Sequence, residues 1–334
     1  MASPAPAQQL VTVFGGSGFV GRHVVRALVK RGYRVRVAVR RPDLAGFLQP
    51  LGVVGQIHAV QANLRYPASV TAAVRGADAV VNLVGIMQEQ GRQGFSAVQA
   101  NGARAVAQAC AAAGIARLTH VSALGADAES ASIYARSKAE GEAAVFAAVP
   151  GAVVLRPSVM FGPEDSFFNR FASLARMLPV LPLIGDGATQ FQPAFVGDVA
   201  EIVARAVDGT VPGGRVYELG GPEVLSLRQI VEEICRITGR KRLIAPLPFP
   251  LARIMGSVLQ VADALTLGLI PDELVMTRDQ VTLLESDNVV SPAAVAEGRD
   301  FAGLGLAPTS SEAIVPAYLW RFRRTGQFDT LRDA

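Results

Sequence analysis

Short apolar runs alternate with amphipathic helical segments through the first half of the chain. Buried strands separated by helices are typical of a parallel sheet covered on both faces, so the pattern predicts a doubly wound α/β domain. The strand-like runs are Leu10–Phe14, Tyr33–Val39, Gln56–Gln61, Ala79–Val84, Leu118–Ser122 and Val153–Arg156, and the helical segments are Phe19–Arg31 and Phe95–Ala113.

The pattern changes after residue 160, where prolines become dense. A helix is predicted over Val196–Val207, followed by a late strand over Arg215–Leu219 that can rejoin the sheet. Gly220-Gly221-Pro222 then interrupts the chain before another helix over Ser226–Thr238. The second half therefore predicts a smaller, interrupted domain.

Composition bounds the function classes. Of the 334 residues, 50% are hydrophobic and 18% are charged, which is enough apolar material for a sizeable core. No apolar run is long enough to span a membrane, and the opening MASPAPAQQL lacks the features of a secretory signal, so a cytoplasmic protein is expected. The net charge of +4 is too small and dispersed for nucleic-acid binding, and three histidines and two cysteines without ligand spacing predict no metal site.

A glycine triplet carries the strongest chemical signal. Gly15, Gly18 and Gly21 lie between a predicted strand and a predicted helix. The first permits a sharp turn, the second lets the backbone approach phosphates, and the third allows close packing of the helix on the sheet. Ser17 can add a hydroxyl contact to a phosphate. The alternative is a turn that only packs, but its place between strand and helix favours a dinucleotide site.

The end of the second predicted strand indicates which dinucleotide is bound. A site for NAD usually places a carboxylate there to accept from the ribose 2′-hydroxyl. This chain has Arg40 and Arg41 instead, and guanidinium groups suit a 2′-phosphate. The sequence therefore predicts NADP(H), with two solvated strand-end arginines as the alternative.

These motifs set the expected domain organisation. We expect residues 1–9 to be a flexible tail, and 10–165 to form a Rossmann-type NADP(H)-binding domain to which 192–220 return. Residues 166–191 and 221–330 would form a smaller, mostly helical domain for a substrate or a partner.

A tyrosine and a lysine supply the candidate catalytic pair. Tyr134 and Lys138 are four residues apart and share a helix face, and Ser122 ends a strand upstream of them. A lysine so placed can lower the pKa of the tyrosine and hold the nicotinamide ribose, while the tyrosine transfers a proton.

The chain resembles the extended and atypical short-chain dehydrogenase/reductases. More narrowly, it resembles the NADPH-binding accessory subunit family of respiratory complex I, the NADH:ubiquinone oxidoreductase. The motifs that carry this resemblance between Val11 and Val290 are GGSGFVGRHVV, THVSALGAD, YARSKAEGE, LRPSVMFGPEDSFFNRFA, LPLIGDGATQFQPAFVGDVA, YELGGPEVLSLRQI and TRDQVTLLESDNVV. The phenylalanine-rich segment and the late TRDQV motif are the most specific.

The resemblance implies a set of cofactor contacts. It places the pyrophosphate at the glycine turn, the 2′-phosphate at the arginines, the nicotinamide ribose at the Tyr–Lys pair, and the nicotinamide after the strand that ends near residue 156. The implied contacts are Gly15, Ser17, Gly18, Phe19, Val20, Gly21, Arg40, Arg41, Leu64, Val84, Gly85, Tyr134, Lys138, Pro157 and Val159.

Two positions depart from the pattern of active relatives. Such relatives carry a Ser or Thr one or two residues beyond Ser122, whereas this chain has Ala123 and Leu124. The proton relay would then be incomplete unless Ser122 itself substitutes. Asn63 replaces an acidic residue near the adenine, which would alter a contact and not the chemistry.

Two C-terminal segments are candidates for contact with a membrane surface or a large partner. Residues 251–270 are strongly apolar but carry Arg253, Gln260 and Asp263 near one helical face. Residues 320–324 interleave Trp320 and Phe322 with arginines. A core helix and a solvated helix end are the alternatives, and periodicity does not separate burial from an interface.

Two functions follow from the sequence. The first is an accessory or assembly subunit of complex I, with NADP(H) in a largely structural role and peripheral contact with the inner face of the cell membrane. The alternative is an active NADP-dependent reductase, epimerase or dehydratase acting on a quinone- or isoprenoid-related substrate or supporting ubiquinone biosynthesis.

Overall fold

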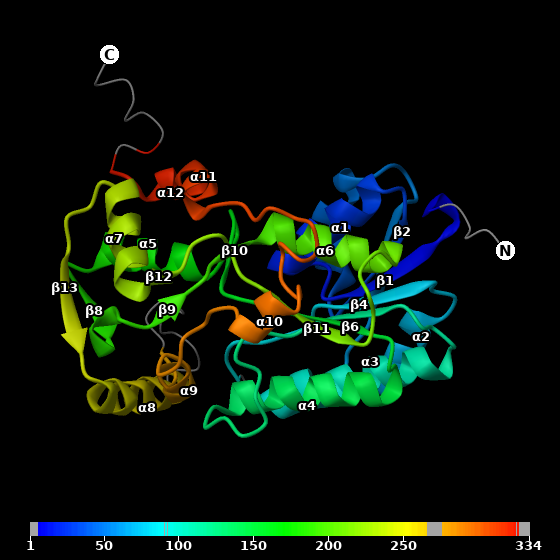
Figure 1. The fold of residues 1–334 in the computed structure, drawn as a ribbon, viewed down its shortest axis with the longest axis horizontal. Coiled ribbons are helices and arrows are strands. Elements are labelled where there is room, and N and C mark those ends of the chain that lie inside the picture. Colours follow the sequence, from blue (N-terminus) through cyan, green and yellow to red (C-terminus); the bar gives the residue numbers. More distant parts are fainter. Residues whose placement is uncertain (1–5, 90, 92, 266–275, 325, 327–334) are drawn as a thin grey trace, which may run out of the picture. The chain divides into compact units, whose positions relative to one another are not determined.

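The computed structural model describes residues 6–89, 91, 93–265, 276–324 and 326 (Figure 1). The chain divides into two compact units. The first comprises Met1–Pro157, Val196–Leu219 and Ser291–Leu306, and the second comprises Ser158–Phe195, Gly220–Val290 and Ala307–Ala334.

The first unit is built on a seven-stranded sheet in the order β11-β6-β5-β4-β1-β2-β3. Every neighbouring pair of strands is parallel, which confirms the predicted doubly wound α/β fold. The strands are β1 (Leu10–Phe14), β2 (Arg34–Val39), β3 (Ile57–Gln61), β4 (Ala79–Asn82), β5 (Leu118–Val121), β6 (Val153–Pro157) and β11 (Arg215–Leu219).

Helices cover both faces of this sheet. Helices α1 and α6 pack together on one face, and α2, α3 and α4 pack together on the other (Figure 1). Their bounds are α1 (Phe19–Lys30), α2 (Pro67–Val74), α3 (Asn101–Ala112), α4 (Ile133–Ala148) and α6 (Val196–Asp208), with a short α10 (Pro292–Ala296) and 3-10 turns at Pro6–Gln8 and Pro42–Leu51.

The helix predicted over Phe95–Ala113 is not a continuous α-helix. Its first part, Ser96–Ala100, is a π-helical turn, and α3 follows it directly. The apolar spacing of an alanine-rich segment does not distinguish one extra residue in a turn, so the sequence did not reveal this change.

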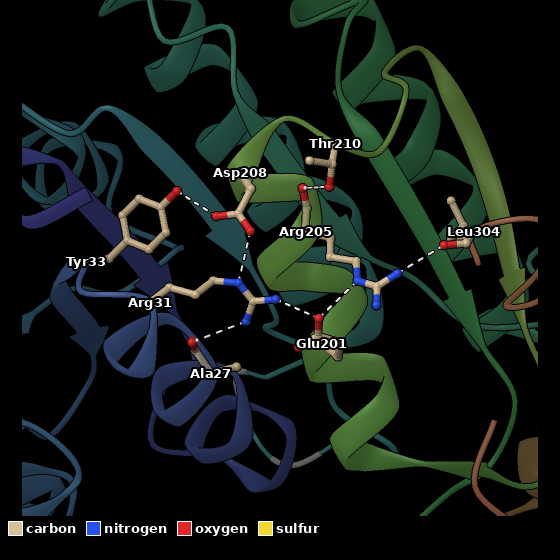
Figure 2. A network of polar contacts seen from close by, with 8 residues as sticks. All are labelled: Ala27, Arg31, Tyr33, Glu201, Arg205, Asp208, Thr210 and Leu304. Carbon is tan, nitrogen blue, oxygen red and sulfur yellow. Dashed lines mark hydrogen bonds and ion pairs between the residues drawn. The ribbon is translucent and has the colours of Figure 1, made fainter. Parts of the chain in front are cut away.

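A polar network fixes α6 to the connection between α1 and β2 (Figure 2). Arg31, at the end of α1, pairs with Glu201 at 2.6 Å and with Asp208 at 2.9 Å, both on α6. The Tyr33 hydroxyl donates to Asp208 Oδ1 at 2.7 Å, and Arg205 pairs with Glu201 at 3.0 Å. Burial and the bond to Asp208 raise the pKa of Tyr33 to about 12, so the phenol stays protonated as a donor. The predicted return of residues near 192–220 thus has a specific anchor.

A further segment, Ser291–Leu306, also belongs to the first unit, although we assigned it to the smaller domain. Its polar backbone is tied to β11: the Glu218 N–H donates to the Arg299 carbonyl at 2.8 Å, and Arg299 Nη1 donates to the Val216 carbonyl at 2.8 Å. The Ser291 N–H donates to Glu218 Oε2 at 2.7 Å. The assignment was wrong because these contacts join residues far apart in sequence and leave no mark on local periodicity.

The start of the chain is ordered earlier than the predicted tail of residues 1–9. Pro6–Gln8 form a 3-10 turn, and Gln9 is only 4% exposed. The Leu10 N–H donates to Asp78 Oδ2 at 2.7 Å, which fixes the entry into β1. Residues 1–5 lie outside the described part of the chain.

The second unit has its own core of phenylalanine and aliphatic side chains. Phe161, Phe168, Leu183, Ile230 and Leu319 are among its fully buried members. Its strands form pairs, β7 with β10, β9 with β12, and β8 with β13. The bounds are β7 (Met160–Phe161), β8 (Val180–Ile184), β9 (Gln190–Phe191), β10 (Ala194–Phe195), β12 (Leu225–Ser226), β13 (Leu243–Leu247), α5 (Phe167–Met177), α7 (Leu227–Ile237), α8 (Phe249–Leu265), α9 (Arg278–Leu283), α11 (Ser311–Ile314) and α12 (Pro316–Leu319), with short 3-10 turns at Gly185–Gly187 and Trp320–Phe322.

Candidate functional site

The glycine turn connects the buried end of β1 to the start of α1. Gly15 has φ +78°, a conformation that other residues adopt only under strain, and its N–H donates to the Ala38 carbonyl of β2 at 3.1 Å. Gly18 then donates to the Gly15 carbonyl at 3.0 Å and opens the helix. The turn is therefore fixed by backbone bonds and leaves its outer surface to a ligand.

Gly21 allows α1 to pack directly on this turn. A Cβ atom at Gly21 would lie 2.6 Å from the Cα of Gly16, closer than real Cβ contacts. Within the described chain, the first turn of α1 carries no acidic side chain, and Gly18 caps the helix without a side-chain bond. The backbone N–H groups at Phe19 and Val20, beside Ser17, form the electropositive helix start that binds pyrophosphate in such folds.

The end of β2 presents both predicted arginines at the surface. Arg40 is exposed, and Nη1 donates to the side-chain oxygen of Gln93. Arg41 is also exposed but pairs with Asp43 at 2.9 Å. A third arginine, Arg22 on the first turn of α1, stacks over Phe47 at 5.0 Å from the ring centroid. Arg40 thus bonds a neutral amide and not a carboxylate.

The turn after β4 brings Val84 and Gly85 to the same sheet edge. A Cβ atom on Gly15 would lie 3.2 Å from Val84 Cγ2, and one on Gly85 would lie 3.2 Å from Lys138 Nζ. The Val84 N–H donates to Asn82 Oδ1 at 3.2 Å, which fixes the turn. The structure therefore places the β4 turn between the glycine turn and the candidate lysine.

Leu64 lies after β3 and is 9% exposed. It packs against α3, where a Cβ on Gly102 would come within 2.8 Å of Leu64 Cδ1. The neighbouring Asn63 accepts from the Arg65 N–H at 3.1 Å and so holds its own turn. Most of the Leu64 side chain is therefore used by the core, and its predicted contact with the cofactor stays a prediction.

Tyr134 and Lys138 share one face of α4, as their spacing predicted. Ser132 caps this helix by accepting from the Ala135 N–H at 3.2 Å. The Tyr134 ring packs edge-on against Phe95 at 5.7 Å between centroids, and Lys138 Nζ lies 5.9 Å from the centroid of the Tyr134 ring.

Lys138 is 6% exposed, and its ammonium donates to the Val121 carbonyl at 3.5 Å. Burial lowers the pKa of Lys138 to about 8, and the carboxylate of Glu142 opposes this shift. Glu142 is held by a two-point ion pair with Arg156, at 2.6 and 2.9 Å. The lysine charge is thus only partly compensated inside the protein.

His120 is a buried neighbour of this lysine that the sequence did not single out. The side-chain nitrogen of Asn82 donates to His120 Nδ1 at 3.2 Å. Because Nδ1 accepts this bond, the proton of the neutral ring lies on Nε2. Burial, with a smaller contribution from the charge of Lys138, lowers the pKa of His120 to about 3. The ring is therefore neutral at physiological pH and positions the β4 turn through Asn82.

Ser122 directly follows β5, and its buried hydroxyl has no hydrogen-bond partner among the described residues. The residue is 4% exposed, and its Oγ makes no hydrogen bond with the described residues, while its N–H donates to the Leu155 carbonyl at 2.7 Å. A buried hydroxyl without a partner at the carboxyl edge of the sheet fits a polar ligand there.

The position where active relatives place a second hydroxyl is apolar in this structure. Leu124 is 7% exposed, and its N–H donates to the carbonyl of Pro157 at 3.0 Å. The side chain is therefore fixed in the protein interior, and nothing at this position can donate to a substrate carbonyl.

A polar residue in the second unit, Asn288, joins segments from three of the motifs identified in the sequence. Asn288, from the late TRDQV…DNVV motif, accepts from the Ser158 hydroxyl at 2.7 Å and from the Val159 N–H at 3.1 Å through Oδ1. The Asn288 N–H donates to the Gln190 carbonyl at 2.8 Å, and the Asn288 carbonyl accepts from the Gln192 N–H at 3.1 Å. Three segments separated by up to 130 residues are thereby joined, and Val159 is held by this junction. Pro157 ends β6 in the first unit.

The phenylalanine-rich motif is organised by a buried aspartate. Asp165 is 4% exposed and accepts from the Phe168 N–H at 2.7 Å and from the Tyr318 hydroxyl at 2.6 Å. Burial outweighs these bonds and raises the pKa of Asp165 above its ordinary value. Phe168 is fully buried, and its neighbours Phe167 and Phe171 pack on the same core.

The two C-terminal segments differ in how they are used. In α8, Leu251, Ile254, Met255 and Val258 are 48, 62, 37 and 61% exposed, so an apolar stripe faces outward. In 320–324, Phe322 is buried and Arg321 bonds Pro163 and Asn169, so only Trp320 among its aromatics is exposed, at 38%. Residues 266–270 of the predicted segment lie outside the described residues. No helix among the described residues is both long and apolar enough to cross a bilayer.

Comparisons with known proteins agree with this geometry. The model of the NAD dependent epimerase/dehydratase family matches residues 11–220. The mitochondrial NADH dehydrogenase (ubiquinone) 1 alpha subcomplex subunit 9 of Arabidopsis thaliana is 34% identical over 322 residues, covering 95% of this chain and 79% of that protein. The ceramide reductase of Caulobacter vibrioides is 32% identical over 299 residues, covering 87% and 89%.

Among solved structures, an NADPH-dependent quinone oxidoreductase of Escherichia coli in complex with NADPH superposes with a TM-score of 0.70, at 21% identity, over 92% of this chain and 99% of that one. The sheet order and glycine turn define an extended short-chain dehydrogenase/reductase fold. The chain belongs to the NAD dependent epimerase/dehydratase family, in which it is similar over most of its length to the respiratory-chain subunits. The cofactor class of the family is a nicotinamide dinucleotide.

Replacement of Lys138 tests the electrostatics of the site. We expect Lys138→Met to raise the free energy of unfolding of the ligand-free protein at pH 7, by at most about 3 kcal/mol, because a buried charge is removed. The folded-state pKa of about 8 lies below the ordinary 10.5, so wild-type stability rises between these values as pH rises. The advantage of the variant should therefore shrink toward pH 10.5, as measured by urea denaturation followed by circular dichroism.

The exposed Lys30 supplies the control, since Lys30→Met removes a surface cation and should change stability little at pH 7. A Lys138→Met protein that is less stable than wild type at pH 7 would contradict the buried-charge account.

Proposed function

We propose that this protein is an NADP(H)-binding accessory or assembly subunit of an NADH:ubiquinone oxidoreductase, and that the dinucleotide has a largely structural role. The observation that carries the proposal is the similarity to the Arabidopsis subunit, which extends over 95% of the chain and beyond the family domain that ends at residue 220. The chain retains the segments of the second unit that a simple nucleotide-binding domain would not need.

The structural role of the dinucleotide is supported by the apolar environment after Ser122. A proton relay needs a second hydroxyl near the reacting carbonyl, and Leu124 occupies that position with a buried side chain. Binding to the folded state alone stabilises a protein by about 4 kcal/mol when ligand is a thousandfold above its dissociation constant. The cradle can therefore act as a folding element without turnover.

The preference for NADP(H) is supported by the end of β2. A 2′-phosphate needs a cation and is repelled by a carboxylate, and the first residue after Val39 is the exposed Arg40. Its side-chain partner, Gln93, is neutral, so a phosphate can replace it without breaking an ion pair. Arg41 would have to leave Asp43 to do the same.

Calorimetry with paired arginine variants tests the cofactor. We expect the wild type to bind NADPH more tightly than NADH, and Arg40→Ala to lower the NADPH affinity by about tenfold to a hundredfold with little change for NADH, since a charge-assisted bond is lost. Arg41→Ala is the control and should have a smaller effect because that guanidinium is engaged by Asp43. Equal affinities of the wild type for the two dinucleotides would contradict the assignment.

Helix α8 provides the surface by which such a subunit would dock. Its exposed apolar residues recur at the spacing of one helix face, while Ala252 on the other side is buried against Val281. Arg253 pairs with Glu285 and holds the start of the helix in place. An ordered apolar stripe on the surface is expected where a partner covers it.

Affinity purification from membranes tests this docking. We expect the wild type to co-purify with the oxidoreductase, and Ile254→Asp combined with Val258→Asp to lose the complex while it keeps dinucleotide binding. Val53→Asp with Val54→Asp is the matched control, because these valines are 76 and 105% exposed in the first unit. Failure of the wild type to co-purify would overturn the function, whereas full retention by the α8 variant would overturn only the docking face.

A reductase is the second candidate, favoured by the similarity to the ceramide reductase over 89% of that protein and by the shared face of Tyr134 and Lys138. If the dinucleotide is structural, we expect the wild type and the Tyr134→Phe variant to oxidise NADPH at the same rate in the presence of quinone, long-chain ketone or sugar-nucleotide substrates. The measurement is the loss of absorbance of bound NADPH. Turnover that depends on the Tyr134 hydroxyl would instead establish the reductase.

A further inference from the structure

Seven cationic side chains gather in the second unit, at the end of α5, in the connection from α7 to β13, and at residues 321–324. We call this set the basic patch. Its members are Arg176, Arg240, Lys241, Arg242, Arg321, Arg323 and Arg324.

Contacts between these segments show that they are neighbours. Arg242 Nε donates to the Ala175 carbonyl of α5 at 2.6 Å. Arg240 donates to the Phe322 carbonyl from Nε and Nη2 at 3.0 and 2.8 Å. The Phe322 ring lies 5.7 Å from the Arg176 guanidinium. Three segments of the chain thus bring their cations to one region.

Three arginines of the basic patch are anchored by carbonyl oxygens and not by carboxylates. Besides Arg240 and Arg242, Arg323 is held in this way, since its Nε donates to the Ile237 carbonyl at 2.8 Å. A carbonyl fixes a guanidinium without cancelling its charge, in contrast to the two-point pair of Arg156 with Glu142. Each of these arginines therefore keeps a full positive charge in a defined position.

The electrostatics of Arg240 confirm the local excess of charge. Its pKa is lowered by burial and by the positive charges of Arg242, Arg324 and Arg176. The carboxylates of the adjacent helix α7 are already engaged, since Glu233 pairs with Arg236 at 2.5 Å and Glu232 lies 3.9 Å from Arg228. Among the described residues, no ion pair joins the basic patch to a carboxylate.

Part of this arrangement has a structural explanation. The carbonyls of Ala175 and Ile237 lie in the last turns of α5 and α7, where cations stabilise the negative end of the helix. That accounts for Arg242 and Arg323. It does not account for the exposed Arg176, Lys241 and Arg324, which add charge where each helix end already has a cation.

Exposed apolar side chains border the cations. Met177 follows Arg176 and is 44% exposed, and Leu243 follows Arg242 and is 73% exposed. Leu243 pairs with Val180 between β13 and β8, and Val180 is 40% exposed. Trp320, next to Arg321, is 38% exposed. The surface therefore presents fixed positive charges together with hydrophobic side chains.

We propose that the basic patch binds the surface of an anionic phospholipid bilayer. Cations on such a surface attract lipid phosphates at about 1 kcal/mol each, and bordering apolar and indole side chains insert at the headgroup level. The mixture of cations with the exposed Leu243, Met177 and Trp320 favours a bilayer surface, whose headgroup region binds charged and apolar groups at once. Such binding would be a property of this chain by itself and does not depend on the proposed role in the respiratory chain.

The single tryptophan of the chain is a native probe at this surface. We would mix the full-length protein with vesicles of phosphatidylcholine alone, or with about 30% phosphatidylglycerol, and record sedimentation and tryptophan emission. We expect binding to the anionic vesicles only, a blue shift of the Trp320 emission, quenching by brominated lipid, and loss of binding as salt is raised.

Variants at the exposed members test the assignment. Arg176→Gln, Lys241→Gln and Arg324→Gln together should weaken vesicle binding about a hundredfold, because each removed charge weakens binding about fivefold. None of the three makes a hydrogen bond through its side chain among the described residues, so folding should be retained. The matched control removes three exposed cations of the first unit, with Lys30→Gln, Arg34→Gln and Arg75→Gln, and should bind like the wild type after allowance for net charge.

Several results would overturn the proposal. One is the absence of binding to anionic vesicles, and another is equal loss of binding in the triple variant and its control. Binding that leaves Trp320 emission unchanged would place the contact elsewhere. Binding to a soluble acidic polypeptide without binding to vesicles would identify the basic patch as a protein-docking surface instead.

Discussion

The close packing of the first turn of α1 against the turn that leaves β1 is the constraint on which the candidate site depends. Gly21 has no room for a side chain beside Gly16, and Gly15 needs a positive φ. This contact sets the position of the helix start relative to the sheet. Because all seven strands are parallel, the turns after β2, β4 and β5 reach the same edge as the glycine turn, so Arg40, Gly85 and Ser122 are placed by the sheet and not by local sequence.

The second constraint on the candidate site is the buried positive charge of Lys138. Lys138 is buried beside the end of β5, its partner Glu142 is shared with Arg156, and the neighbouring His120 stays neutral. Such an arrangement lowers the stability of the ligand-free fold and favours a ligand with hydroxyl groups near the ammonium. The same site lacks a second hydroxyl after Ser122, since Leu124 is packed in the interior. A protein that uses a dinucleotide only for its structure needs the groups that bind it and does not need a complete proton relay.

The fold of the first unit was predictable because each of its elements carries a local signal. The short apolar runs and the glycine spacing gave the sheet and its first helix to within a few positions, whereas the ligand contacts of the site residues stay predictions. The second unit was less predictable because it is held by single polar residues that join distant segments, as Asn288 joins residues 158–159 to 190–192 and Asp165 accepts from Tyr318. The return of 291–306 to β11 and the bond of His120 with Asn82 have the same origin. The π-turn before α3 was missed for a local reason, because apolar spacing does not distinguish one extra residue in a turn. Burial of a helix face also could not be separated from an interface, and only the structure shows the α8 stripe exposed.

The nucleotide content of the protein as purified tests the central claim most directly. After gel filtration, the protein would be denatured and the released nucleotides separated by chromatography and quantified. A cradle that uses its ligand as a folding element should retain a stoichiometric amount of NADP(H), and prior incubation with carbonyl compounds should not change its redox state. A protein that is folded and empty, or that carries NAD(H), would contradict the account.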